Sequence, residues 1–205
     1  MLGVSDRFFP LTDRIHSATT VELSEAALAV DAGITKLCAG LSEEQLSWRP
    51  RPGRWSIAEN LAHLRTTTEV FLPVVDSALE ASRKLKLHGE GPFTLNLYGR
   101  LLVWGMEARP VVKMQAPKRI WPKLLSSPAS ELEHFLISQV ALRRRIADAD
   151  GLDLTALRFP SPVANYFRVN LLEFFSAFNA HSRRHLWQAN KVRRAMPPST
   201  LQNRA

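Results

Sequence analysis

The chain has 205 residues, of which 45% are hydrophobic and 22% are charged. This composition is typical of a globular domain with one core, and it excludes fibrous, low-complexity and intrinsically disordered proteins. The 27 lysines and arginines outnumber the 19 aspartates and glutamates, which gives a formal net charge of +8 and favours anionic partners.

The first predicted helix covers residues 20–39. Thr19 and Glu22 have the spacing of a capping box at its start, and Gly40 suits the position just after its end. Apolar residues recur at helical spacing between these points, and Cys38 lies on the same stripe. Because Cys38 is the single cysteine, an internal disulfide is excluded, and we expect its side chain to be a buried apolar group rather than a nucleophile.

Two further capping boxes follow. Ser42 and Gln45 predict a single helical turn, and Ser56 and Glu59 predict the start of the second long helix. We expect Pro73 to kink this helix or to end its regular part, because proline lacks the N–H that an interior helical position donates.

The next segment, residues 83–125, is basic and contains four of the 13 prolines. It predicts an irregular insertion with one short helix near residues 95–106. Ser127 and Pro128 suit the N-cap and first position of a third helix, and a fourth helix is expected over residues 168–194. No segment shows a convincing strand alternation bounded by hairpin turns.

The predicted fold class is therefore all-α: a four-helix bundle with an irregular insertion between the second and third helices. We expect an N-terminal extension over residues 1–18, the bundle over residues 19–196 and a polar C-terminal tail over residues 197–205. No uncharged apolar run approaches the length of a membrane-spanning helix, and the N-terminus does not resemble a secretory signal. We therefore expect a soluble, cytoplasmic protein with no membrane partner.

Three histidines are candidate metal ligands. His181 and His185 stand four residues apart on the predicted fourth helix, beside its apolar stripe, at a spacing that lets two imidazoles reach one ion. The pattern alone favours a simpler interpretation, in which each buried ring is neutral and hydrogen-bonded to a carbonyl or hydroxyl group. His63 is a candidate third ligand, and on a helical wheel it lies on the flank of the apolar stripe of the second helix.

The segment LSEEQLSWRPRPGRWSIAENLAHL, followed far downstream by HSRRHLWQ, closely resembles the DinB-like superfamily of four-helix bundles. This superfamily includes metal-dependent thiol transferases related to bacillithiol S-transferases and to mycothiol-dependent maleylpyruvate isomerase. The resemblance runs from about residue 20 to residue 194, but the insertion at residues 83–125 does not align with it. It implies that His63, His181 and His185 bind a divalent metal, with zinc and nickel favoured, and that the protein forms a homodimer.

Three functions remain open from the sequence. A divalent ion on three neutral imidazoles lowers the pKa of a bound water or thiol and polarises an electrophile. Our first hypothesis is a metal-dependent enzyme that transfers a low-molecular-weight thiol to a small electrophile. The alternatives are a metal-dependent hydrolase of small molecules and a non-catalytic, stress-related binding bundle.

The partners expected from the sequence are small molecules. Gln188 follows His185 by three residues, and we interpret it as a contact to the thiol cosubstrate or as support for a ligand imidazole. Basic residues around Trp121 interleave with an aromatic side chain, as in nucleic-acid-binding surfaces. No recognised nucleic-acid-binding motif accompanies them, so no nucleic-acid partner is expected.

Overall fold

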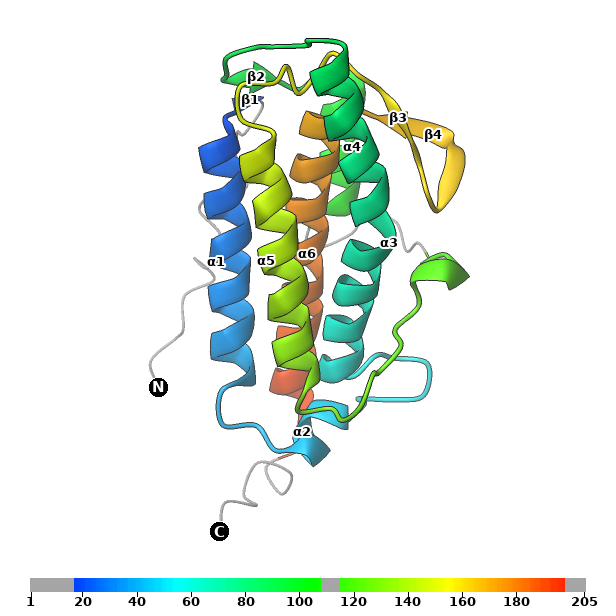
Figure 1. The fold of residues 1–205 in the computed structure, drawn as a ribbon. Coiled ribbons are helices and arrows are strands. Elements are labelled where there is room, and N and C mark those ends of the chain that lie inside the picture. Colours follow the sequence, from blue (N-terminus) through cyan, green and yellow to red (C-terminus); the bar gives the residue numbers. More distant parts are fainter. Residues whose placement is uncertain (1–16, 108–114, 198–205) are drawn as a thin grey trace.

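The computed structural model of the protein describes residues 17–107 and 115–197. Four long helices run side by side along one axis (Figure 1): α1 (Thr20–Cys38), α3 (Ile57–Lys84), α5 (Glu131–Asp148) and α6 (Leu171–Ala195). Each helix packs against two neighbours, in the order α1, α5, α3, α6 around the bundle. The predicted four-helix bundle is therefore confirmed, and α3 and α6 are adjacent and antiparallel (Figure 1).

Shorter elements connect the long helices. They are the helices α2 (Glu43–Ser47) and α4 (Leu97–Met106), the 3-10 helix η1 (Lys118–Ile120), and the strands β1 (Ser17–Ala18), β2 (Phe93–Thr94), β3 (Phe159–Ser161) and β4 (Ala164–Val169). Strand β1 pairs antiparallel with β2, and β3 pairs antiparallel with β4. Within the described residues, no helix is long and apolar enough to cross a membrane.

Four helices begin with a complete capping box. In each, an N-cap side chain accepts a hydrogen bond from the backbone N–H three residues later, and the side chain at that later position accepts one from the N-cap backbone. The pairs are Thr19 with Glu22, Ser42 with Gln45, Ser56 with Glu59, and Asn170 with Glu173. The first three confirm the predicted helix starts, and the fourth fixes the start of α6 at Leu171 rather than at the expected residue 168.

Of the two outcomes expected at Pro73, a kink or an end, the second is wrong, because helix α3 continues to Lys84. Pro73 faces solvent, where water can satisfy the carbonyl that its missing N–H leaves free. The residues that follow it, among them Val75 and Leu79, are almost completely buried in the core. The free energy gained by burying this last part of the helix is larger than the free energy lost with one hydrogen bond.

The third long helix, α5, starts at Glu131 with Ser130 as its N-cap residue, three residues later than expected. Ser127 and Ser130 instead form a local turn, in which the Ser130 hydroxyl donates to the Ser127 carbonyl at 2.9 Å. Serine side chains compete in this way with helical hydrogen bonds.

The hairpin β3–β4 was not predicted. Phe159 pairs with Val169 and Pro160 with Arg168, and the register shifts between Pro160 and Ser161. Two prolines and this irregularity hide the alternation by which a strand is recognised in a sequence.

The insertion is docked on the bundle by α4, which packs against α6. Gly99 allows a close approach, since a Cβ atom there would lie 2.9 Å from the Cγ of Glu173. At the end of α4, the Arg183 Nε on α6 donates to a Glu107 carboxylate oxygen at 3.0 Å. The insertion is thus held against one of the helices that carry the candidate metal ligands.

Candidate metal centre

The three candidate ligands meet between α3 and α6. The Nε2 atom of His181 lies 3.3 Å from the Nε2 of His63 and 3.1 Å from the Nε2 of His185, and all three ligand atoms lie within 4.8 Å of one another. In a tetrahedral zinc site, each ligand nitrogen lies about 2.0–2.1 Å from the ion, so that two ligand nitrogens are about 3.3 Å apart. The observed spacing therefore suits three ligands of one divalent ion.

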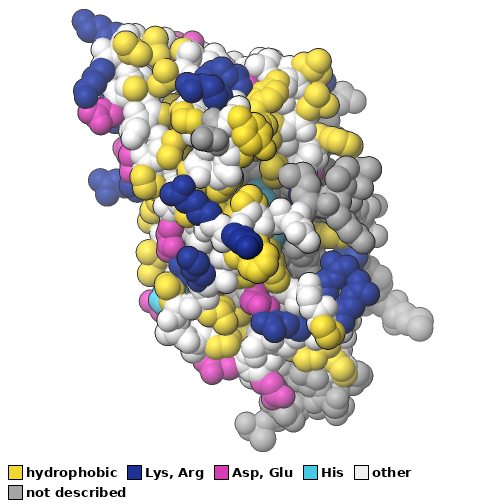
Figure 2. All heavy atoms as spheres, turned by 90° about the vertical axis from the view of Figure 1, so that its right-hand side faces the viewer, with side chains coloured by type: hydrophobic (Ala, Val, Ile, Leu, Met, Phe, Trp, Pro, Cys, Tyr) yellow, Lys and Arg dark blue, Asp and Glu magenta, His cyan; other side chains and the backbone are white. Residues whose placement is uncertain are grey.

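The site lies below the surface, with access on one side. His63 and His185 are only 1% and 5% exposed, whereas His181 is partly exposed. Figure 2 shows histidine atoms in a recess near the middle of the face it presents, among hydrophobic and basic side chains. The exposed part of His181 is where the centre meets solvent.

Two of the rings are oriented through their other nitrogen. The Nδ1 of His63 lies 2.5 Å from the backbone carbonyl oxygen of Ile120, and the Nδ1 of His185 lies 2.8 Å from the Oδ1 of Asn60. Asn60 donates its Nδ2 to the Ser56 carbonyl at 2.8 Å, so its oxygen faces His185. Since both acceptors take a proton from Nδ1, the Nε2 lone pairs of both rings point to the common centre.

These contacts bear on the simpler interpretation, in which the histidines are neutral core residues bound to polar neighbours. The carbonyl and amide partners occupy only the Nδ1 side of His63 and His185. The Nε2 atoms of both rings face the His181 Nε2, which has at most one proton and can donate it to only one of them at a time. A bound cation gives these lone pairs a partner.

Aromatic side chains close part of the site. The Trp55 ring lies 4.8 Å from the His63 ring and 5.8 Å from the His185 ring, measured between centroids. Phe178 contacts His181 with a centroid distance of 6.4 Å. These rings exclude water from one side, which strengthens electrostatic interactions within the site.

Burial keeps the three imidazoles neutral. It is the main cause that lowers the pKa of His63, against the opposing effect of the Ile120 carbonyl. Burial, together with His63 and Arg184, lowers the pKa of His181 to about 3. Burial and the two neighbouring rings hold the pKa of His185 well below its ordinary value. Neutral imidazole is the form that binds a metal, so the donor set fits a divalent ion.

Arg184 is the one cation among the described residues that adds its charge to both His181 and His185. Arg184 is only 8% exposed, and its Nε has no hydrogen-bond partner within the described part of the chain. Burial lowers the pKa of this guanidinium, while the charge of Glu107 acts in the opposite direction. A buried positive charge of this kind is stabilised by an anionic ligand.

The structure thus brings together the three histidines singled out in the sequence. Gln188 lies on α6, three residues after His185, and is half-buried, and its role as a cosubstrate contact stays a prediction. Two contributors were missed: Asn60 and the Ile120 carbonyl. The position of Asn60, three residues before His63 on the same helix, is a signal that could have been used. A backbone carbonyl in an irregular segment leaves no such signal.

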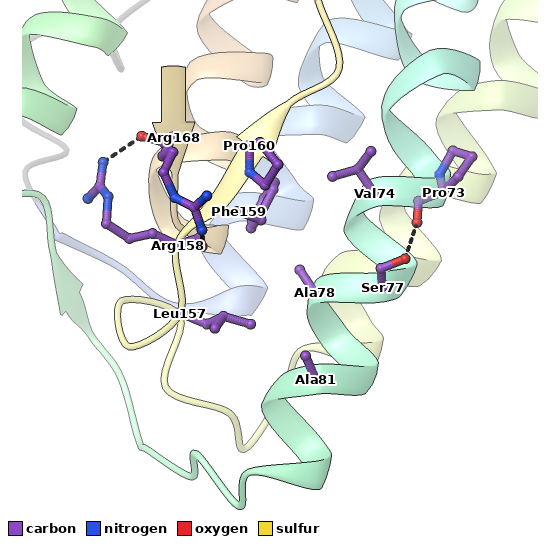
Figure 3. A pocket seen from close by; sticks show the side chains of 10 residues that line it. All are labelled: Pro73, Val74, Ser77, Ala78, Ala81, Leu157, Arg158, Phe159, Pro160 and Arg168. Atoms are coloured by element: carbon purple, nitrogen blue, oxygen red, sulfur yellow. Dashed lines mark hydrogen bonds between the residues drawn. The ribbon is translucent and has the colours of Figure 1, made fainter. Parts of the chain in front are cut away.

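A separate groove lies between α3 and the β3–β4 hairpin. Figure 3 shows Pro73, Val74 and Ala78 on α3 facing Phe159 and other residues of the hairpin. Pro73 is ten residues after His63, or about 15 Å along the helix axis. None of the three histidines lines this groove, which is therefore distinct from the candidate metal centre.

The fold and the site define a helical bundle with a three-histidine centre between two adjacent helices. The family model of the DinB superfamily matches residues 29–189, and the chain belongs to this superfamily. The resemblance seen in the sequence is thereby confirmed.

A solved structure shares the fold. YfiT from Bacillus subtilis, described as a probable metal-dependent hydrolase with an unusual four-helix bundle topology, aligns with a TM-score of 0.55 and 14% sequence identity. The alignment covers 85% of this chain and 86% of YfiT. No curated protein sequence matches the chain.

Proposed function

We propose that this protein is a metal-dependent enzyme that transfers a low-molecular-weight thiol to a small electrophile. The observation that supports a metal is that the His181 Nε2 lies 3.3 Å and 3.1 Å from the Nε2 atoms of His63 and His185, with one ligand nitrogen of each ring within 4.8 Å of the others. A divalent ion held there, with zinc and nickel expected from the superfamily resemblance, would supply Lewis acidity that lowers the pKa of a thiol or water and polarises an electrophile.

The surrounding residues have separate tasks in this proposal. The Ile120 carbonyl and the Asn60 amide hold the protons on Nδ1 of His63 and His185, so that both Nε2 atoms stay free to bind. Trp55 excludes water from one side of these two rings. The partly exposed side of His181 admits the reactants.

Arg184 supports an anionic reactant. Its guanidinium is buried beside the centre and its Nε is unpaired within the described residues, so a thiolate or carboxylate bound there would restore the lost solvation. The formal net charge of +8 also favours the approach of an anion.

The second candidate function is a metal-dependent hydrolase of small molecules, in which water is the nucleophile. It is favoured by the fold shared with YfiT, which is described as a probable metal-dependent hydrolase. Product analysis of an electrophilic test compound with and without added thiol separates the two functions. Thiol adducts support transfer, whereas hydrolysis products formed at the same rate without thiol support hydrolysis.

The experiment that tests the metal centre is elemental analysis of untagged protein. Wild-type protein is expected to hold one divalent ion per chain, and His185→Ala is expected to hold none, because two imidazoles rarely suffice for a stable site. His88→Ala is the matched control, since His88 is exposed and lies outside the site. Unchanged metal content in His185→Ala would refute the ligand assignment.

A further inference from the structure

The segment that follows η1 contacts both the metal centre and two bundle helices. Residues 120–125, which we call the strap, begin with the Ile120 carbonyl that accepts from His63 Nδ1. The Ile120 side chain is only 7% exposed, so the start of the strap is anchored in the protein interior. The strap belongs to the segment that connects α3 to α5.

A buried ion pair holds the rest of the strap. Arg65 on α3 donates its Nε to the Glu131 Oε2 on α5 at 3.3 Å, and these side chains are only 3% and 0% exposed. Arg65 also donates to the Lys123 carbonyl, and the Leu125 N–H donates to Glu131 Oε1 at 2.7 Å. Arg65 and Glu131 thus each form a hydrogen bond with the backbone of the strap in addition to their ion pair.

We propose that the Arg65–Glu131 pair clamps the strap across α3 and α5, and that the clamped Ile120 carbonyl sets the tautomer and orientation of His63. Arg65 and Glu131 are positioning residues, because they act on the centre through the strap. The consequence for metal affinity rests on the proposed function, whereas the consequence for the tautomer does not.

The chemistry behind this proposal is simple. A carbonyl oxygen only accepts hydrogen bonds, so it stabilises the His63 tautomer with its proton on Nδ1 and a lone pair on Nε2. If the carbonyl moves away, the proton can occupy Nε2, and that tautomer cannot bind a metal through Nε2. Loss of an outer partner of a metal-ligating histidine commonly weakens metal affinity by about 10- to 100-fold.

The test uses the full chain with both members of the pair replaced, Arg65→Met with Glu131→Leu. Replacing both partners avoids an unpaired buried charge, and such replacements often preserve the fold. The matched control is Asp31→Leu with Arg143→Met, which removes an ion pair between α5 and its other neighbouring helix, α1, without touching the strap. Circular dichroism and urea unfolding verify that both double variants are folded.

Two measurements follow. We call Arg65→Met with Glu131→Leu the strap variant. In metal-free protein, imidazole ¹⁵N chemical shifts are expected to show His63 protonated at Nδ1 in the wild type and in the control, and a mixture of both His63 tautomers in the strap variant. Zinc competition with a chromophoric chelator is expected to give a dissociation constant about 10- to 100-fold higher for the strap variant and unchanged for the control.

An unchanged His63 tautomer in the folded strap variant would overturn the proposal, as would equal losses of zinc affinity in both double variants. If wild-type protein binds no zinc, but the His63 tautomer differs between the wild type and the strap variant, the proposed function fails and the clamp stands. Should the double variant not fold, Leu125→Pro decides, because it removes the N–H that donates to Glu131 and leaves Arg65 and Glu131 in place. It is expected to change the tautomer in the same direction, and no change would refute the clamp.

Discussion

A single amide side chain connects a helix start to a metal ligand. Asn60 donates to the carbonyl of Ser56, the N-cap residue of α3, and accepts from His185 on α6. Because the amide is 1% exposed, water does not compete for either hydrogen bond. The orientation of His185 therefore depends on how α3 begins, although the two residues belong to different helices.

Asp31 provides a pH-dependent contribution to stability. Burial raises its pKa to about 6, against the opposing effect of the Arg143 charge, and its Oδ1 has no hydrogen-bond partner among the described residues. Between the ordinary pKa of 3.8 and about 6, the folded state binds more protons than the unfolded state. The contribution of this group to the free energy of unfolding therefore falls as the pH rises.

Asp31→Asn removes this titration. From pH 4 to pH 6.5, the free energy of unfolding of the variant should rise relative to that of the wild type by about 2 kcal/mol, since a shift of one pKa unit corresponds to about 1.4 kcal/mol and part of the titration falls outside this range. Urea unfolding of both proteins across this range measures the difference. A difference that stays constant, or one that falls with pH, would contradict the raised pKa.

At the scale of single residues, the sequence was informative where chemistry is carried by side chains. The spacing of His181 and His185 predicted that both rings share one face of a helix, and the superfamily resemblance added His63. The helical wheel placed His63 on the flank of an apolar stripe, whereas it is 1% exposed. The flank is buried because α6 and the strap cover it, and neither contact is encoded in the periodicity of α3.

At the scale of elements, capping fixes the rotation of the ligand-bearing helices. Successive residues of an α-helix are rotated by about 100°, so a shift of one residue in the start would turn a ligand away from the centre. Both α3 and α6 begin with a complete capping box. The box at Ser56 lies two turns before His63 and thus defines the direction of this ligand.

Ser56→Ala is expected to lower the free energy of unfolding by about 1 kcal/mol, because the Glu59 N–H loses its side-chain acceptor at the start of α3. Urea unfolding measures the change. Ser47→Ala is the control, since the hydroxyl of Ser47, the last residue of α2, donates to the Glu43 carbonyl and caps no N–H group. Equal losses in the two variants would show that the cap has no special contribution.

The predictability of the elements follows the range of the interactions that form them. Capping boxes are local, and three of them correctly predicted helix starts at Thr19, Ser42 and Ser56. The predicted start of α5 was wrong, because Ser127 and Ser130 form a local turn and because Glu131 is held by Arg65, which lies 66 residues earlier in the sequence. The β3–β4 hairpin was missed since its prolines and register shift conceal the strand pattern.

At the scale of the whole molecule, the insertion and the bundle form one structure around the centre. Helix α4 packs on α6, and the strap contacts both α3 and α5. The core of the bundle consists of two clusters of buried residues, one beside the hairpin and a second beside α2. A change in the insertion can therefore reach the ligands without altering the helices that carry them.

Removal of a bound ion should destabilise the entire molecule, because the ligands join two of the four long helices. At a free zinc concentration about 1,000 times the dissociation constant, binding adds about 4 kcal/mol to the free energy of unfolding. For a chain of this size, the midpoint of thermal unfolding should rise by roughly 10 °C. Differential scanning calorimetry with zinc and with a chelator measures the shift.

The same scans on His185→Ala provide the control, and this variant should unfold at one temperature under both conditions. Identical midpoints for wild-type protein with zinc and with chelator would contradict a metal bound only to the folded state.

The distribution of the ligands along the chain has a consequence for biosynthesis. Two of the three histidines lie on α6, which is the last helix of the described chain, and the remaining one lies 118 residues upstream of His181. A ribosome releases α3 long before it synthesises α6, so a nascent or truncated product offers a single imidazole. Tight capture of an ion then marks chains whose translation has reached the C-terminal helix.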